Sequence, residues 1–331
     1  MMDSLIRKFP AQLKEAIEIG ENIVVRPHDH PISKVVMCGM GGSGIGGMYV
    51  ANLVADECPC PYIINSSYTL PAYVDKNSLV IASSYSGNTE ETLSAMQAAI
   101  HRGAKVVCVA SGGKMLDLAE DRGLDHVTIP SGWPSPRACL GYSLVQQAYI
   151  LRCLGLIGHN LTTNLRTAAD LISFEQDDIM KKAEQIAGLL YGKMPVIYTT
   201  DRSEAVAVRW RQQINENSKQ LCWHHVIPEM NHNELVGWKQ MQENVAVIFL
   251  RMKDDLKRNQ FRTDLTKQIV SKLTPAVVEI FAKGQSMAEK MMYLTHLGDW
   301  LSWYLAGLNN VDASEVNVID YLKSELSNPG I

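Results

Sequence analysis

The sequence lacks the apolar stretch that a membrane-spanning helix requires, because no run approaches about 18 residues. It also lacks a basic run in either half, and its formal net charge is −4. A nucleic-acid or membrane-surface protein would show such a run. The segment from Met1 to Ala11 contains Asp3, Arg7 and Lys8 but no apolar core of a signal peptide. We therefore expect a cytoplasmic protein that binds neither nucleic acid nor membrane.

Paired cysteines are also missing. The seven cysteines are an odd number scattered from Cys38 to Cys222, and several lie in apolar runs. This pattern indicates free thiols in a reducing compartment. The one close pair, Cys58-Pro59-Cys60, does not have the two-residue spacing of a zinc site and has no second pair. We expect no metal and no cofactor.

The 331 residues with 46% hydrophobic composition suffice for two domains, each with its own core. Short apolar runs alternate with helical patterns in both halves, which predicts two mainly parallel sheets flanked by helices on both faces, an α/β fold. Strands are expected at residues 34–38, 62–65, 79–83, 105–110, 127–130, 196–199, 245–250 and 276–280, and one polar helix at about 164–190. A boundary in the Gly155–Asn160 stretch gives domains 1–158 and 159–331.

A glycine-rich segment, Gly39–Gly47, follows the first strand and opens a helix. Glycines allow the backbone to approach an anion closely, and the N–H groups of the helix start attract it. Gly41, Gly42 and the hydroxyl of Ser43 are the candidate phosphate contacts. The segment also fits the dinucleotide pattern G-x-G-x-x-G, but that pattern needs an acid after the second strand, where the sequence reads Ile64-Asn65-Ser66-Ser67.

A second polar turn follows the third strand and places three hydroxyls, those of Ser84, Ser86 and Thr89, before a helix. Three hydroxyls beside a helix N-terminus form a compact site for one phosphate group. The alternative is that these residues only cap the helix, which would account for one hydroxyl and not for three.

The run S-x-S-G-x-T from Ser84 to Thr89 resembles the signature of sugar isomerase (SIS) domains. Together with Gly-Met-Gly-Gly-Ser-Gly it resembles the bifunctional phosphoglucose/phosphomannose isomerases. Further matching segments are 136–142, 215–219, 231–234 and 319–323. The resemblance implies two SIS subdomains in each chain, a sugar-phosphate substrate, and a homodimer with its active site at the subunit interface.

An aldose–ketose isomerase needs a base that moves a proton between C1 and C2, groups that open the ring, and positive charge near the enediolate. Glu216, late in a helix and flanked by amides, is the candidate base that the resemblance implies. His232, in a polar loop, is implied to open the ring from the partner subunit, and His224 and His225 are weaker rivals. Arg137, expected to begin a helix, offers a permanent charge. The helix dipole disfavours an arginine in the first turn, and that cost favours a functional role for Arg137. Lys323 in the last helix is implied to contact the sugar.

The expected function is therefore isomerisation of glucose 6-phosphate and fructose 6-phosphate, extending to mannose 6-phosphate. The approach to Lys323 departs from the proline- and threonine-rich pattern of the resembled family, since it reads Asp312-Ala313-Ser314-Glu315-Val316. Ser314 is the candidate small hydroxyl residue that gives room to the C2 epimer. Two alternatives remain open: a non-catalytic sugar-phosphate sensor, and an SIS enzyme that acts on an amino-sugar or pentose phosphate.

Overall fold

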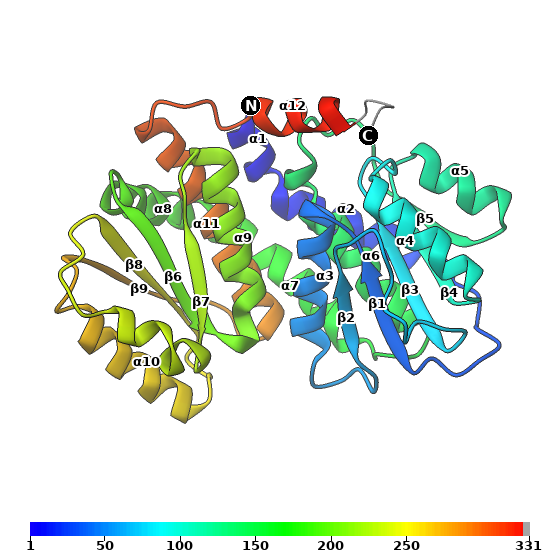
Figure 1. The fold of residues 1–331 in the computed structure, drawn as a ribbon, viewed down its shortest axis with the longest axis horizontal. Helices are drawn as coiled ribbons and strands as arrows, with labels where there is room; N and C mark the ends of the chain where they lie inside the picture. The colour runs from blue at the N-terminus through cyan, green and yellow to red at the C-terminus, as the bar shows by residue number, and fades with distance from the viewer. Residues whose placement is uncertain (327–331) are drawn as a thin grey trace. The chain divides into compact units, whose positions relative to one another are not determined.

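The computed structural model describes residues 1–326, and the chain forms two compact units (Figure 1). The N-terminal unit comprises Arg7–Glu175 and Lys283–Tyr293. The C-terminal unit comprises Met1–Ile6, Gln176–Ala282 and the described chain from Leu294. The expected boundary after residue 158 lies inside the first of these ranges, because the helix that follows it packs against a helix near the N-terminus. The domain ranges 1–158 and 159–331 stay a prediction.

The N-terminal unit is built on a five-stranded parallel sheet in the order β2-β1-β3-β4-β5. The strands are β1 (Lys34–Cys38), β2 (Tyr62–Asn65), β3 (Ser78–Ser83), β4 (Lys105–Ala110) and β5 (Asp125–Thr128). Four of them coincide with the expected ranges to within one residue, and β5 begins two residues earlier than expected. The apolar runs predict them because a parallel sheet is buried on both faces.

Helices cover both faces of this sheet. Successive side chains of β1 point to opposite faces: Val36 joins the core beneath α4 and α5, whereas Met37 packs against Gly47 of α3. The helices of the unit are α2 (Phe9–Glu21), α3 (Gly41–Val54), α4 (Glu90–His101), α5 (Gly113–Asp121), α6 (Leu140–Cys153) and α7 (Asn160–Phe174). A short 3-10 turn, η1 (Pro136–Ala138), precedes α6.

The C-terminal unit repeats the arrangement with a four-stranded parallel sheet in the order β7-β6-β8-β9. Its strands are β6 (Met194–Thr200), β7 (Trp223–Ile227), β8 (Val245–Arg251) and β9 (Ala276–Phe281). Its helices and 3-10 turns are α1 (Met2–Arg7), α8 (Gln176–Leu190), η2 (Asp201–Ser203), α9 (Glu204–Ser218), η3 (Glu229–His232), η4 (Glu234–Gly237), α10 (Lys257–Val270), α11 (Met287–Leu308, shared with the other unit) and α12 (Asn317–Leu326). One face of the sheet packs against α10 through Val270, and α8 and α9 contact the strands as well. The expected α/β class with two parallel sheets flanked by helices is confirmed.

Three local expectations were wrong. The polar helix expected over residues 164–190 is two helices, α7 and α8, separated at Glu175, whose carboxylate pairs with Lys283 Nζ at 2.5 Å. Arg137 does not begin a long helix, since it lies in η1 and α6 starts at Leu140. Strand β7 was not expected at all, because it is a half-buried edge strand without an apolar run.

All seven cysteines are free thiols, and four of them are buried: Cys38, Cys108, Cys139 and Cys222. Burial raises the pKa of Cys38 and Cys108 to about 12, so neither forms a thiolate near neutral pH. No helix among residues 1–326 is both long and apolar enough to cross a membrane.

Candidate functional site

The two polar segments singled out in the sequence lie together at one edge of the N-terminal sheet. Strands β1 and β3 are adjacent and parallel, so the loops that follow them leave the sheet at the same end (Figure 1). The strand β1 pairs with β2 on one side and with β3 on the other, which makes this position the point where the strand order reverses. In open α/β sheets ligands bind in the crevice at this point.

The hydroxyls of the Ser84–Thr89 turn are organised by the turn itself. Ser84 Oγ and Thr89 Oγ1 share a hydrogen bond of 2.8 Å, and the Gly87 N–H donates to Ser84 Oγ at 3.1 Å. The Asn88 N–H donates to Ser86 Oγ at 3.2 Å. Ser84 is buried, Thr89 is half-buried and Ser86 is exposed. The solvent exposure of the three residues therefore increases from Ser84 through Thr89 to Ser86.

Glycine is required at position 87. Its φ is +67°, and a Cβ atom there would lie 1.8 Å from the carbonyl oxygen of Gly112. The loop before α5 supports the turn from that side, because the Met115 N–H donates to Gly87 O at 3.0 Å and the Lys114 N–H donates to Asn88 Oδ1 at 3.1 Å. The turn is therefore preorganised by backbone contacts.

Helix capping does not account for these hydroxyls. Thr89 is the N-cap residue of α4, but its side chain makes no capping hydrogen bond and bonds to Ser84 instead. Met40, the N-cap residue of α3, makes no side-chain cap either. Two helix N-termini without side-chain caps thus start at the same edge of the sheet, and such N–H groups attract an anion.

Arg137 lies beside the glycine-rich segment. A Cβ atom built on Gly42 would be 3.0 Å from Pro136 O and 3.5 Å from Arg137 Cα, so only glycine lets η1 pack this closely against α3. The structure thus brings Arg137 to the segment that contains Gly41, Gly42 and Ser43 within one unit. The argument that a helix dipole disfavours this arginine no longer applies, because Arg137 precedes α6 by three residues.

The corresponding edge of the C-terminal sheet contains a carboxylate beside the hydroxyls of Thr200 and Ser203. Asp255 follows β8, and its two oxygens accept hydrogen bonds from Thr200 Oγ1 at 3.0 Å and from the Met252 N–H at 3.1 Å. Burial raises the pKa of Asp255 above its ordinary value. A side-chain carboxylate therefore takes up the donors that an incoming anion would need, and the phosphate hypothesis applies to the N-terminal unit alone.

Glu216 lies in the last turn of α9, half-buried, within a polar run from Asn215 to Lys219. Asn217 Nδ2 donates to Ser302 Oγ at 2.9 Å, and Ser218 Oγ donates to Ser302 O at 2.8 Å. The amide and the hydroxyl that flank Glu216 on its C-terminal side thus fasten the end of α9 to α11. The predicted base is held on a rigid support.

His232 is exposed at the end of η3. Helix α9 joins the end of β6 to the start of the parallel strand β7, so Glu216 precedes β7 in the chain and His232 follows it. The segment after β7 folds back along the strand, since Nε1 of Trp223, the first residue of β7, donates to Glu234 Oε1 at 3.3 Å. The role of His232, and the chain that it serves, stay predictions.

Lys323 lies on α12, whose residues are all exposed, as are its large apolar side chains, among them Val318, Tyr321 and Leu322. Ser314, in the loop that leads to α12, is half-buried and donates its N–H to Asp312 Oδ1 at 2.8 Å. The role of Lys323 stays a prediction.

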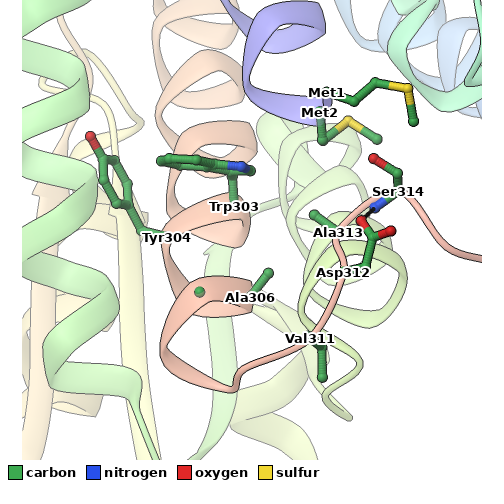
Figure 2. A pocket seen from close by; sticks show the side chains of 10 residues that line it. Met1, Met2, Trp303, Tyr304, Ala306, Val311, Asp312, Ala313 and Ser314 are labelled. Atoms are coloured by element: carbon green, nitrogen blue, oxygen red, sulfur yellow. Dashed lines mark hydrogen bonds between the residues drawn. The ribbon is translucent and has the colours of Figure 1, made fainter.

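A cavity of about 290 Å³ lies in the C-terminal unit, and Ser314 is the one predicted residue that lines it. Figure 2 shows the cavity between Trp303 and Tyr304 of α11 and the loop of residues 311–314, with Met1 and Met2 beside that loop. Sequence patterns did not indicate this cavity, since its walls come from the two ends of the chain.

Among residues 1–326, no three His, Cys, Asp or Glu side chains are grouped as metal ligands would be. At the end of β2, where a dinucleotide site needs an acid, stands Asn65, whose amide donates to Ser67 O at 3.4 Å.

Comparisons with known proteins show which proteins the chain is similar to. A model of the family described as the bacterial phospho-glucose isomerase C-terminal SIS domain matches residues 179–326. The bifunctional phosphoglucose/phosphomannose isomerase of Caldicellulosiruptor bescii is 40% identical over 97% of this chain and 98% of its own. The enzyme of the same name from Aquifex aeolicus is 36% identical over 89% of this chain and 91% of its own.

Among solved structures, the C-terminal domain of glucosamine-fructose-6-phosphate aminotransferase from Francisella tularensis is similar with a TM-score of 0.74. It is 16% identical, over 95% of this chain and 98% of that one. At this identity the likeness shows the fold alone.

The Ser84–Thr89 turn predicts a specific loss of phosphate binding. Ser84→Ala removes the hydroxyl that bonds Thr89 Oγ1 and the Gly87 N–H, and we expect the dissociation constant for a hexose 6-phosphate to rise about tenfold or more. Titration calorimetry measures it. The matched control is Ser94→Ala in α4, the helix that follows the turn, because the Ser94 hydroxyl bonds Tyr68 O. Equal affinity of Ser84→Ala and wild type would refute the phosphate site.

Proposed function

The chain belongs to the family of bifunctional phosphoglucose/phosphomannose isomerases, and from this premise we propose how its own residues perform the reaction. The enzyme interconverts the aldose and ketose forms of hexose 6-phosphates: glucose 6-phosphate, mannose 6-phosphate and fructose 6-phosphate. The observation that carries the proposal is the preorganised hydroxyl turn Ser84–Thr89 beside two helix starts without side-chain caps.

The phosphate group is bound by Gly41, Gly42 and Ser43 at the start of α3 and by Ser84, Ser86 and Thr89 before α4. Backbone N–H groups and hydroxyls are suitable donors for a phosphate, and neither segment contains a lysine. Binding the non-reacting phosphate fixes the sugar, which lowers the entropy cost of bringing C1 and C2 to the base.

Glu216 is the base of the proton transfer. Its carboxylate takes the proton from C2 of the aldose and an enediolate forms. The proton of the O2 hydroxyl passes to O1, and the same carboxylate returns its proton equivalent to C1 to give the ketose. The support for this role is that the end of α9 is anchored to α11 through Asn217 and Ser218, which holds the carboxylate in place. Arg137, whose guanidinium is charged at every working pH, stabilises the negative oxygens of the enediolate.

Ring opening is assigned to His232 and Lys323. His232 follows β7 in the chain, whereas Glu216 precedes that strand at the end of α9. The exposure of His232 leaves it available to a second subunit. We therefore assign His232 to the partner's active site in a homodimer. Each active site then contains residues of two chains.

Replacing Glu216 tests the base. Glu216→Gln retains the size and hydrogen bonds of the side chain but cannot accept the proton, so we expect kcat to fall about a thousandfold with little change in KM. Coupled assays of fructose 6-phosphate conversion to glucose and mannose 6-phosphates measure it. The matched control is Glu184→Gln, an exposed glutamate on α8. Near-normal turnover by Glu216→Gln would show that another group is the base.

Mixing two inactive variants tests the assignment of His232 to the partner. A heterodimer of Glu216→Gln and His232→Asn contains one active site with both residues intact. Random exchange of subunits at equal amounts should therefore restore about a quarter of wild-type activity. If His232 acted within its own chain, or the protein were a monomer by gel filtration, the mixture would stay inactive.

A further inference from the structure

The residue that follows α9 has an unusual backbone. Among residues 1–326, the non-glycine residues with positive φ are Lys219, at +53°, and Asn310, at +55°. Lys219 occupies the position after a helix where glycine is the common residue, because a side chain with a Cβ is strained in the left-handed region. Asparagine tolerates this conformation better than lysine does. A non-glycine residue with a strained backbone at such a place suggests that its side chain has a function.

The ammonium group of Lys219 donates to three backbone carbonyl oxygens. Nζ lies 2.7 Å from Glu216 O, 2.7 Å from Asp312 O and 2.7 Å from Glu315 O. An ammonium has three N–H donors, so these carbonyls use all of them. The positive charge also lies at the C-terminus of α9, where the helix dipole favours a cation.

These carbonyls belong to two separate segments of the C-terminal unit. The first is the last turn of α9, at the residue assigned as the base. The second is the loop 312–315, which Lys219 holds on both sides of Ser314 and which continues into α12 with Lys323. The same loop forms one wall of the cavity in Figure 2. One side chain therefore sets the distance between the Glu216 turn and the segment leading to Lys323.

We propose that Lys219 is a positioning residue of the isomerase, which locks the Glu216 turn to the 312–315 loop. This inference rests on the proposed role of Glu216. Lys219 acts through the backbone that it holds, and its task is the relative placement of the two segments. Misplacement of a reacting group by about 1 Å can cost a hundredfold in rate.

Other contacts hold the end of α9 when Lys219 is replaced. Asn309 Nδ2 donates to Ser218 O at 2.9 Å and to Gln220 Oε1 at 3.0 Å, and Asn217 and Ser218 bond Ser302. The helix end therefore stays attached to α11 in a Lys219 variant. The loop 312–315 loses two of its anchors in the same variant.

The test is Lys219→Gly. Glycine relaxes the positive φ, so we expect Tm to stay equal or rise, while removal of the ammonium lowers kcat about tenfold or more. The KM for fructose 6-phosphate should change less than about twofold, because the phosphate turn belongs to the N-terminal unit. Lys219→Arg, which keeps a cation and several donors, should recover part of kcat. Wild-type kcat in Lys219→Gly would overturn the proposal.

The matched control is Asn310→Gly, which relaxes the other positive φ without removing a cation and should keep wild-type kinetics. A second readout is hydrogen exchange of the amides of residues 312–322, which should become faster in Lys219→Gly and not in Asn310→Gly. A loss of kcat in Lys219→Gly with unchanged hydrogen exchange would also overturn the proposal that Lys219 holds the 312–315 loop. If exchange is faster in Lys219→Gly while Glu216→Gln keeps near-normal turnover, Lys219 holds the loop as proposed but Glu216 is not the base.

Discussion

The parallel direction of the strands is the constraint on which both halves of the site depend. In the N-terminal unit it brings the loops after β1 and β3 to one edge of the sheet, where two helices start without side-chain caps. In the C-terminal unit it has the opposite effect. Because α9 must return the chain to the start of β7, its last turn, with Glu216, lies at the edge of the sheet opposite to the one where β6 ends. The same rule thus places the Ser84–Thr89 turn and the Glu216 turn at opposite kinds of edge of their own sheets.

The two units share an architecture and differ in chemistry at the equivalent edge. Where the first has the hydroxyls of Ser84 and Thr89, the second has Asp255, whose carboxylate accepts from Thr200 and Met252. A half-buried carboxylate that already accepts from the nearby donors leaves no place for a phosphate. In the C-terminal unit the proposed base lies at the other edge of the sheet. There α9 ends, and Lys219 joins its last turn to the loop before α12.

Much of this could be predicted from the sequence. Apolar runs located the central strands, and the three hydroxyls from Ser84 to Thr89 identified the phosphate turn, since both signals are local. Strand β7 was missed because its edge position leaves His224 and His225 half-buried. The dipole argument for Arg137 failed because tertiary packing on Gly42 places it in a 3-10 turn. Neither the Thr200 contact of Asp255 nor two of the three carbonyls around Lys219 could be foreseen, because these partners are 55 to 96 residues apart in the chain.

Solvent exchange during turnover tests the central claim, a proton transfer between C1 and C2, most directly. Fructose 6-phosphate is incubated with the enzyme in D₂O, and deuterium at C1 of the ketose and C2 of the aldoses is followed by NMR. A base that takes and returns a proton exposes it to solvent, so deuterium should appear at both carbons with wild type and be absent with Glu216→Gln. Interconversion without deuterium at either carbon would indicate direct hydride transfer and contradict the enediolate mechanism.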